Sequence, residues 1–226
     1  MIITIDGTAS SGKSTISTRA AKQIGFAHVN SGSLYRAIAL QSIKAGIPAT
    51  DTSALVNEIK NKTHIEVRIE DGESVIYLNG ARVAAELRSP EVTAIVPEIA
   101  KIPEIRECAR VLQHKIAETT PNFIVEGRDV GSVVFPNADI KFFVTADLDA
   151  RAKRRQNEYL GLGKNVPLDA VKEELAERDH EDSTRKNSPL VVPKGAITLD
   201  TTHLNIEEAT AALIASITAH TKTYPT

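Results

Sequence analysis

The sequence has little of what marks a secreted, membrane-spanning or nucleic-acid-binding protein. It holds one cysteine, Cys108, so an internal disulfide is excluded. No apolar run approaches the ~20 residues that a membrane span needs. The net charge is −2 and aromatic residues make up 4% of the chain, which argues against a nucleic-acid-binding module. A strand is predicted at the N-terminus, which leaves no room for a signal peptide, so we expect a cytoplasmic protein without membrane or nucleic-acid partners.

The most informative motif follows a short apolar run at residues 2–5. It fits G-x-x-x-x-G-K-[ST], the phosphate-binding P-loop, between a predicted strand and a predicted helix. Gly7 and Gly12 permit backbone angles that a Cβ would forbid, so successive N–H groups can form a nest for phosphate oxygens. Lys13 supplies a cation for the β- and γ-phosphates of ATP, and the Ser14 hydroxyl supplies a ligand for Mg²⁺. The predicted nucleotide-binding residues are Gly7, Thr8, Ala9, Ser10, Ser11, Gly12, Lys13, Ser14 and Thr15.

Strand and helix patterns alternate along most of the chain, which predicts an α/β fold with an open parallel sheet flanked by helices. We expect Gly25 to end the first helix and Ser31-Gly32-Ser33 to form a turn. We also expect Pro97 and Pro103 to interrupt a helical stretch. The predicted strands are 2–5, 27–29, 123–125, 140–144 and 196–199, and the predicted helices are 14–24, 34–45, 91–117, one after residue 145, 168–179 and 206–217.

Residues 64–83 have a different character. Apolar residues alternate with charged ones, a period of two that predicts a half-buried strand. Asp71-Gly72 and Asn79-Gly80 are hairpin turn signals. These features predict a small antiparallel sheet inserted into the parallel α/β protein.

Several arginines are candidates for holding a second phosphate, because ligands of α/β sheets bind at the carboxyl ends of the strands. Arg128 and Asp129 follow the predicted strand 123–125 directly, a placement that is unusual for surface residues. Arg36 and Arg106 lie on predicted helices, where an isolated arginine is usually solvated.

Two helical stretches carry clustered charges. Arg151, Arg154 and Arg155 have a spacing that gathers guanidinium groups on one helix face. They form either a solvated basic face or a lid that closes over a transferring phosphoryl group and excludes water. Gly161 and Gly163 would permit such movement.

Three more charged residues recur at helical spacing: Arg178, Asp182 and Arg185. A polar helix end with internal ion pairs is the simpler interpretation. The sequence shows no metal-ligand cluster, no Ser/His/Asp triad and no dinucleotide-binding G-x-G-x-x-G pattern.

Together these motifs resemble the bacterial cytidylate kinases, a family of nucleoside monophosphate kinases, over essentially the whole chain. The run from residue 127 to 138 is the specific one, whereas the P-loop is shared by many families. The inserted sheet also resembles the enlarged monophosphate-binding domain of this family. The matching segments are residues 5–15, 31–36, 127–138, 151–155 and 177–185.

The resemblance implies transfer of the ATP γ-phosphoryl group to CMP or dCMP with Mg²⁺. It implies that Arg36 and Arg128 hold the acceptor phosphate and that Arg178 and Asp182 contact the sugar. The cytosine pocket that it implies consists of Ser31, Arg106, Asp129 and Arg185.

The resemblance also implies a lid and a set of catalytic cations. Arg151, Arg154 and Arg155 would be lid arginines on the ATP phosphates. The implied catalytic residues are Lys13, Arg128, Arg151 and Arg155, with Arg154 in the ATP site. Two positions depart from the family pattern: Asn30 stands where an aspartate is frequent, and Pro97 stands where a serine that reaches the sugar is frequent.

We therefore expect one chain with three functional parts that acts as a monomer on ATP and CMP or dCMP. The expected parts are a core (1–30, 84–149 and 186–226), a monophosphate-binding insert (31–83), and a lid with its flanking helix (150–185). Alternatives are a P-loop kinase for UMP or a non-nucleotide acceptor, and a P-loop GTPase or ATPase switch. The switch is disfavoured because the Asn-Lys-x-Asp guanine motif is missing from the sequence.

Overall fold

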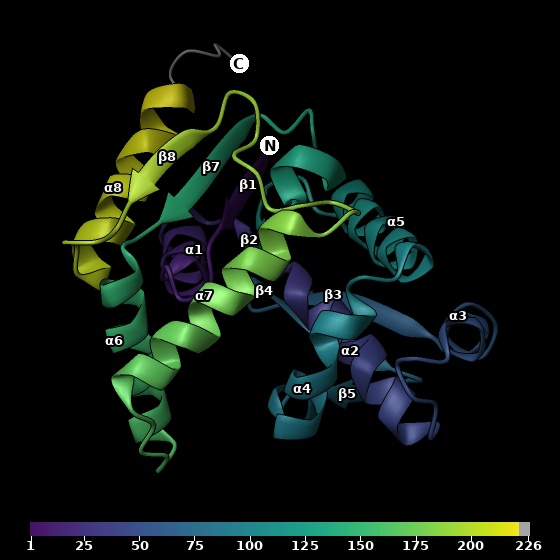
Figure 1. Ribbon diagram of the computed structural model, residues 1–226. Helices are drawn as coiled ribbons and strands as arrows, with labels where there is room; N and C mark the ends of the chain where they lie inside the picture. The colour runs from purple at the N-terminus through teal and green to yellow at the C-terminus, as the bar shows by residue number, and fades with distance from the viewer. Residues whose placement is uncertain (222–226) are drawn as a thin grey trace. The chain divides into compact units, whose positions relative to one another are not determined.

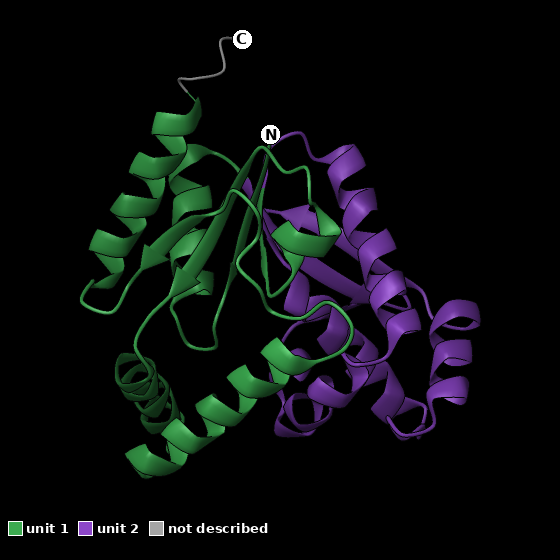
Figure 2. Ribbon diagram, turned by 45° about the horizontal axis from the view of Figure 1, so that its top comes forward, with its two compact units in different colours: residues 1–26, 124–226 green, residues 27–123 purple. Residues whose placement is uncertain are grey.

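The computed structural model describes residues 1–221 as an α/β protein with two compact units (Figures 1 and 2). Unit 1 comprises residues 1–26 and the chain from residue 124 onward, and unit 2 comprises residues 27–123. Within residues 1–221, no helix has both the length and the apolar character that a membrane crossing requires.

Unit 1 is built on a parallel arrangement of strands. Their order is β6-β1-β7-β8, with β1 parallel to β7 and β7 parallel to β8. The strands are β1 (Ile2–Gly7), β6 (Phe123–Gly127), β7 (Ile140–Thr145) and β8 (Ile197–Asp200). The helices are α1 (Lys13–Ile24), α6 (Leu148–Gly161), α7 (Leu168–Thr184) and α8 (Ile206–Thr221), and a π-helical turn spans Val130–Val134.

The core of unit 1 lies between these strands and two helices. Ile5 of β1 pairs with Phe142 of β7, and both side chains are fully buried. Ile16 of α1 and Leu213 of α8 pack into the same apolar cluster. Because parallel strands are covered on their faces, their inward residues read as nearly continuous apolar runs. This packing fixes the carboxyl end of β1, where the P-loop begins.

Unit 2 combines three antiparallel strands with a set of helices. β3 pairs antiparallel with β4, and β4 pairs antiparallel with β5. β4 also pairs parallel with β2 at His28 and Glu73, so these strands extend the sheet of β2. The strands are β2 (Ala27–Asn30), β3 (Ile65–Glu70), β4 (Glu73–Leu78) and β5 (Ala81–Val83). The helices are α2 (Ser31–Lys44), α3 (Thr52–Asn61), α4 (Pro90–Ile99) and α5 (Pro103–Thr119), with a 3₁₀ turn at Glu86–Arg88.

The predicted α/β class, the helix after the P-loop and the inserted antiparallel strands are confirmed. Asp71 and Asn79 have φ values of 51° and 52°, the left-handed conformation that the two hairpin turns need. The antiparallel strands are not a separate sheet, however, because β4 joins β2.

Two local expectations are wrong, and one helix was missed. Ser31-Gly32-Ser33 is the first turn of α2 and not a loop. Pro97 lies inside α4, which continues to Ile99, and does not interrupt the helix there. The helix α3 was not predicted at all, although Leu55 and Ile59 bury one of its faces. Compact unit 2 spans residues 27–123, whereas the predicted monophosphate-binding insert spans residues 31–83; the functional division remains a prediction.

A cap residue provides a simple test of unit 2. The Asp51 carboxylate accepts a hydrogen bond of 3.1 Å from the Ala54 N–H at the start of α3. Asp51→Ala should lower the free energy of unfolding by about 1 kcal/mol, because the N–H loses its acceptor. Urea unfolding followed by circular dichroism measures this, with Thr52→Ala on the same exposed turn as control. Equal midpoints for the two variants would contradict the capping role.

Candidate active site

The P-loop lies between β1 and α1, as its motif predicts. Gly12 has a φ of 85°, in the left-handed region that favours glycine. At Gly7 the backbone runs so close to β7 that a Cβ would collide with the carbonyl oxygen of Val144. Both glycines are therefore required by the shape of the loop, which directs the start of α1 toward any bound anion.

Lys13 is buried at the start of α1. Its Nζ donates a hydrogen bond of 3.0 Å to the carbonyl oxygen of Thr8, inside the loop. Burial lowers the pKa of Lys13 to about 7, and the positive charge of Arg128 acts in the same direction. A phosphate at this point would favour the charged form of the lysine.

Ser14 and Glu126 form an oxygen pair next to the loop. The Ser14 hydroxyl donates a hydrogen bond of 2.6 Å to Oε2 of Glu126, a buried residue of β6. Mg²⁺ prefers oxygen ligands and is usually held by one or two carboxylates together with substrate phosphates. Within residues 1–221 no cluster of three or more histidines, cysteines or carboxylates could hold a metal alone. The donor set thus fits Mg²⁺ that arrives with a nucleotide.

Four charged residues form an alternating chain beyond β6. Arg128 Nε donates to Oδ2 of Asp182 at 2.9 Å. Arg185 lies between the two carboxylates, at 3.3 Å from Oδ1 of Asp182 and 3.7 Å from Oδ1 of Asp129. Arg178 is one helical turn before Asp182 on α7, and its charge lowers the pKa of Lys13. The structure therefore brings these predicted site residues together in unit 1.

The three arginines of α6 have different surroundings. Arg151 is buried and donates to the carbonyl oxygens of Ala146 (2.8 Å) and Ala9 (3.2 Å). It also pairs with Asp179 of α7, whose other oxygen accepts the Ala9 N–H at 3.2 Å. Arg151 thus braces the P-loop and both helices in this structure, so its predicted phosphate contact remains a prediction.

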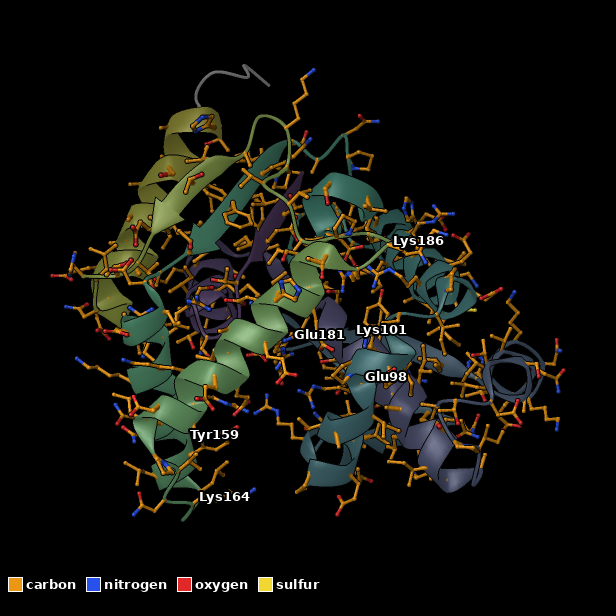
Figure 3. The ribbon with its side chains drawn as sticks, viewed as in Figure 1. Glu98, Lys101, Tyr159, Lys164, Glu181 and Lys186 are labelled. Atoms are coloured by element: carbon orange, nitrogen blue, oxygen red, sulfur yellow. The ribbon has the colours of Figure 1, made fainter. Side chains whose placement is uncertain are left out.

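Arg154 and Arg155 lie further along α6. Arg154 donates to Thr201 Oγ1 at 3.0 Å and to the Ser11 carbonyl oxygen at 3.4 Å, behind the P-loop. The Arg155 side chain is 27% exposed, pairs with Glu158 and stacks over the ring of Tyr159. Figure 3 labels Tyr159 near the end of α6. The Arg155 side chain is more exposed than that of Arg151, and both Glu158 and Tyr159 lie on α6 outside the P-loop.

Unit 2 contains the remaining predicted site residues. Arg36 on α2 donates to the Leu87 carbonyl oxygen at 3.0 Å and to Thr93 Oγ1 at 2.9 Å. Arg106 on α5 is buried, and its guanidinium lies 5.4 Å from the ring centre of Tyr35. Ser31 is buried at the first position of α2. Their roles toward a substrate remain predictions.

Sequence reasoning missed several residues that shape this site: Asp6, Glu126, Asp179 and Thr201. The Asp6 carboxylate accepts two backbone N–H groups, and burial raises its pKa to about 6. A usable signal existed for Asp6 and Glu126, since each is an acidic residue at the carboxyl end of a buried strand. Asp179 and Thr201 carry no such signal.

The P-loop after the first strand, with Lys13 and a cluster of arginines in the same unit, defines a P-loop nucleotide kinase. The profile of the family described as Cytidylate kinase matches residues 3–219. The chain belongs to the cytidylate kinase family.

Individual relatives agree with this assignment. The cytidylate kinase of Caldanaerobacter subterraneus subsp. tengcongensis is 42% identical over 220 residues, which cover 97% of this chain and 96% of that protein. The cytidylate kinase of Caldicellulosiruptor bescii is 40% identical over 91% of this chain and 90% of that protein. A crystal structure of an uncharacterized protein from Eubacterium ventriosum matches with a TM-score of 0.51 at 12% identity. It covers 97% of this chain and 99% of that protein, and it supports the fold alone.

The low pKa of Lys13 predicts proton uptake when a nucleotide binds. With a pKa of about 7, the free lysine is about nine-tenths neutral at pH 8, and a phosphate would return it to the charged form. ATP titrated by calorimetry at pH 8, in buffers of different ionisation enthalpy, should show uptake of close to one proton. Below pH 6 this contribution should vanish.

The control for this prediction is a lysine on the same helix. Lys13→Met should abolish the buffer dependence at pH 8, whereas Lys22→Met, an exposed change in the last turn of α1, should leave it unchanged. The same buffer dependence in Lys13→Met and the unchanged protein would contradict the assignment.

Proposed function

We propose that this protein transfers the γ-phosphoryl group of ATP to CMP or dCMP, with Mg²⁺, and forms CDP or dCDP. The alternating chain Asp129–Arg185–Asp182–Arg128 is the observation that carries the proposal. The charge of Arg128, at one end of this chain, lowers the pKa of Lys13 in the P-loop. Unit 1 therefore contains cations that could hold two phosphates and carboxylates that could accept from a base.

The donor half of the site is the P-loop. Backbone N–H groups at the start of α1 and the Lys13 ammonium bind the phosphates of ATP and neutralise charge that develops between the β- and γ-phosphates. Ser14 and Glu126 would hold Mg²⁺. Held there, Mg²⁺ would supply positive charge that lowers the repulsion between the phosphates.

The acceptor half of the site explains a preference for cytosine. Cytosine presents an N4 amine that donates, whereas uracil presents the acceptor O4 at the same place. A carboxylate such as Asp129 accepts from N4, and it would face a second acceptor in uracil. Arg185, held by Asp182 and Asp129, can donate to the acceptor edge of the base. An unpaired buried polar group costs about 1–3 kcal/mol, which is enough to discriminate strongly against UMP.

The reaction needs no side-chain base. A phosphate monoester has a second pKa near 6, so at pH 7 the CMP phosphate is already a nucleophile. One of its oxygens forms a bond to the γ-phosphorus, the bond from that phosphorus to the bridging oxygen breaks, and the electron pair leaves on ADP. Arg128 and Lys13 hold the two phosphates against their mutual repulsion, so the enzyme acts by alignment and electrostatic stabilisation.

The helices α6 and α7 suit the role of a lid and its flanking helix. They pack on one another through Val171, Leu175 and Ala152, and this cluster includes Ala9 of the P-loop. Arg155 lies on this helix pair with a half-buried side chain, where closure over a nucleotide would take it out of water. The remaining functional division, into core and monophosphate-binding insert, follows the resemblance to the family.

A substrate panel tests the proposal. In a coupled assay with ATP, kcat/KM should be far higher for CMP and dCMP than for UMP and AMP. Asp129→Ala should lower kcat/KM for CMP about 10- to 100-fold, because the N4 amine loses its acceptor, and should leave KM for ATP within about twofold. The control is Asp169→Ala, which removes an exposed carboxylate from the first turn of α7 and should change neither.

A clear preference for UMP or AMP would overturn the proposed acceptor. Equal losses toward CMP and ATP in Asp129→Ala would contradict the role of this residue in reading the base. Appreciable ATP turnover without any acceptor would instead favour a P-loop ATPase.

A further inference from the structure

Asp6 is fully buried at the carboxyl end of β1 and belongs to neither half of the site described above. Its two oxygens accept separate hydrogen bonds from consecutive residues on a distant segment. Oδ1 accepts the Val130 N–H and Oδ2 accepts the Gly131 N–H, each at 2.8 Å. A carboxylate shared in this way fixes both the distance and the orientation of the segment that donates to it.

The segment that Asp6 holds is the π-helical turn after Arg128 and Asp129. Within the turn, the Asp129 carbonyl oxygen accepts from the N–H groups of Val133 (2.9 Å) and Val134 (3.2 Å). The first N–H groups of a helical turn have no acceptor within the turn. Asp6 provides these acceptors, so the backbone directly after Asp129 is tied to β1.

Gly131 gives an independent sign that this turn lies close against β1. A Cβ built on Gly131 would lie 2.6 Å from Thr4 Oγ1, 3.1 Å from Asp6 Oδ2 and 3.2 Å from a carbon of Pro193. Real Cβ atoms essentially never approach other heavy atoms to 2.6 Å, so an alanine here would push the turn away from the strand.

We propose that Asp6 is a positioning residue for the acceptor site, which sets Asp129 and Arg128 against the P-loop through the N–H groups of Val130 and Gly131. The P-loop begins at Gly7, the next residue, so one residue of β1 ties the donor loop to the segment that reads the acceptor. This inference rests on the proposed function, because it takes Asp129 as the group that reads cytosine.

Asp6→Asn is the sharpest variant because it preserves the size of the side chain. An asparagine has one oxygen and one NH₂ group, so it can accept only one of the two N–H groups and would present a donor to the other. The turn should shift, and with it Asp129. The loss of base recognition should appear as a lower ratio of kcat/KM for CMP to kcat/KM for UMP.

Thr4→Val is the matched control. Thr4 lies two residues earlier on β1, is fully buried and would meet the same Cβ at Gly131. Among the described residues its hydroxyl has no hydrogen-bond partner, so valine should replace it without loss. Gly131→Ala is a second test variant, since it moves the turn and leaves the Asp6 carboxylate intact.

The experiment compares the unchanged protein with Asp6→Asn, Gly131→Ala, Thr4→Val and Asp129→Ala, each first shown to be folded by circular dichroism. For Asp6→Asn and Gly131→Ala we expect kcat/KM for CMP to fall about tenfold or more, and the CMP-to-UMP ratio to fall at least about fivefold. KM for ATP should stay within about threefold, and Thr4→Val should match the unchanged protein. If Asp6→Asn does not fold, Gly131→Ala alone carries the test.

The outcomes separate the inference from the proposed function. A CMP-to-UMP ratio that collapses in Asp129→Ala but is unchanged in Asp6→Asn and Gly131→Ala overturns the positioning role of Asp6 and leaves the proposed function intact. An unchanged ratio in Asp129→Ala refutes the base-reading role of that residue and the inference with it. Equal losses toward CMP, UMP and ATP in Asp6→Asn show a merely structural aspartate and also overturn the inference.

Discussion

The whole arrangement of unit 1 depends on the need to partner ionisable groups that lie away from water. Asp6, Lys13, Glu126, Asp129 and Arg151 are all buried. An isolated buried charge costs several kcal/mol or more, so such groups persist only where hydrogen bonds and opposite charges surround them. Here the partners come from segments far apart in the chain: Asp6 holds the turn after β6, and Arg151 holds the loop after β1. The charges therefore determine where the loops lie, and they do so at the carboxyl ends of neighbouring strands.

The fold was largely predictable where local chemistry and tertiary structure agree. Gly12 and the Asn79-Gly80 turn have positive φ angles that few residues adopt, so the residue types alone predict their conformation. Prediction failed where the two disagree. Ser31, Gly32 and Ser33 favour turns, yet they form the first turn of α2, in which Ser31, Leu34 and Tyr35 are buried.

Pro97 is a second case in which a local preference was overridden, because the predicted helix break does not occur there. A proline inside a helix removes one N–H donor and usually ends the helix. In α4 the helix ends two residues later at Ile99, so only the last turn lacks its bond, and the burial of Val92 and Ile99 stabilises the rest. Nothing in the order of the residues reveals that this short stretch is anchored at both ends.

The site divides in a similar way. Arg178, Asp182 and Arg185 recur at helical spacing, and Arg128 and Asp129 directly follow a buried strand, so these residues could be recognised as site candidates. The partners of the structural aspartates could not. Asp6 and Asp179 act on backbone N–H groups that lie 124 and 170 residues away, and a backbone N–H is the same at every position of a sequence. Such partners become visible only when the chain has folded.

The hydrogen bonds of Arg151 and Asp179 to Ala9 restrict how α6 and α7 can move. Both polar groups of one P-loop residue, its N–H and its carbonyl oxygen, are bound to side chains from two different helices. Neither α6 nor α7 can swing away as a whole without breaking these bonds. If these bonds are kept, a closing motion has to bend α6 beyond Arg151, while the P-loop end of the helix pair stays in place. The part that moves would then be the segment with Arg155 and Gly163. A nucleotide bound in the P-loop would act on the fixed end of this segment through Ala9, Arg151 and Asp179.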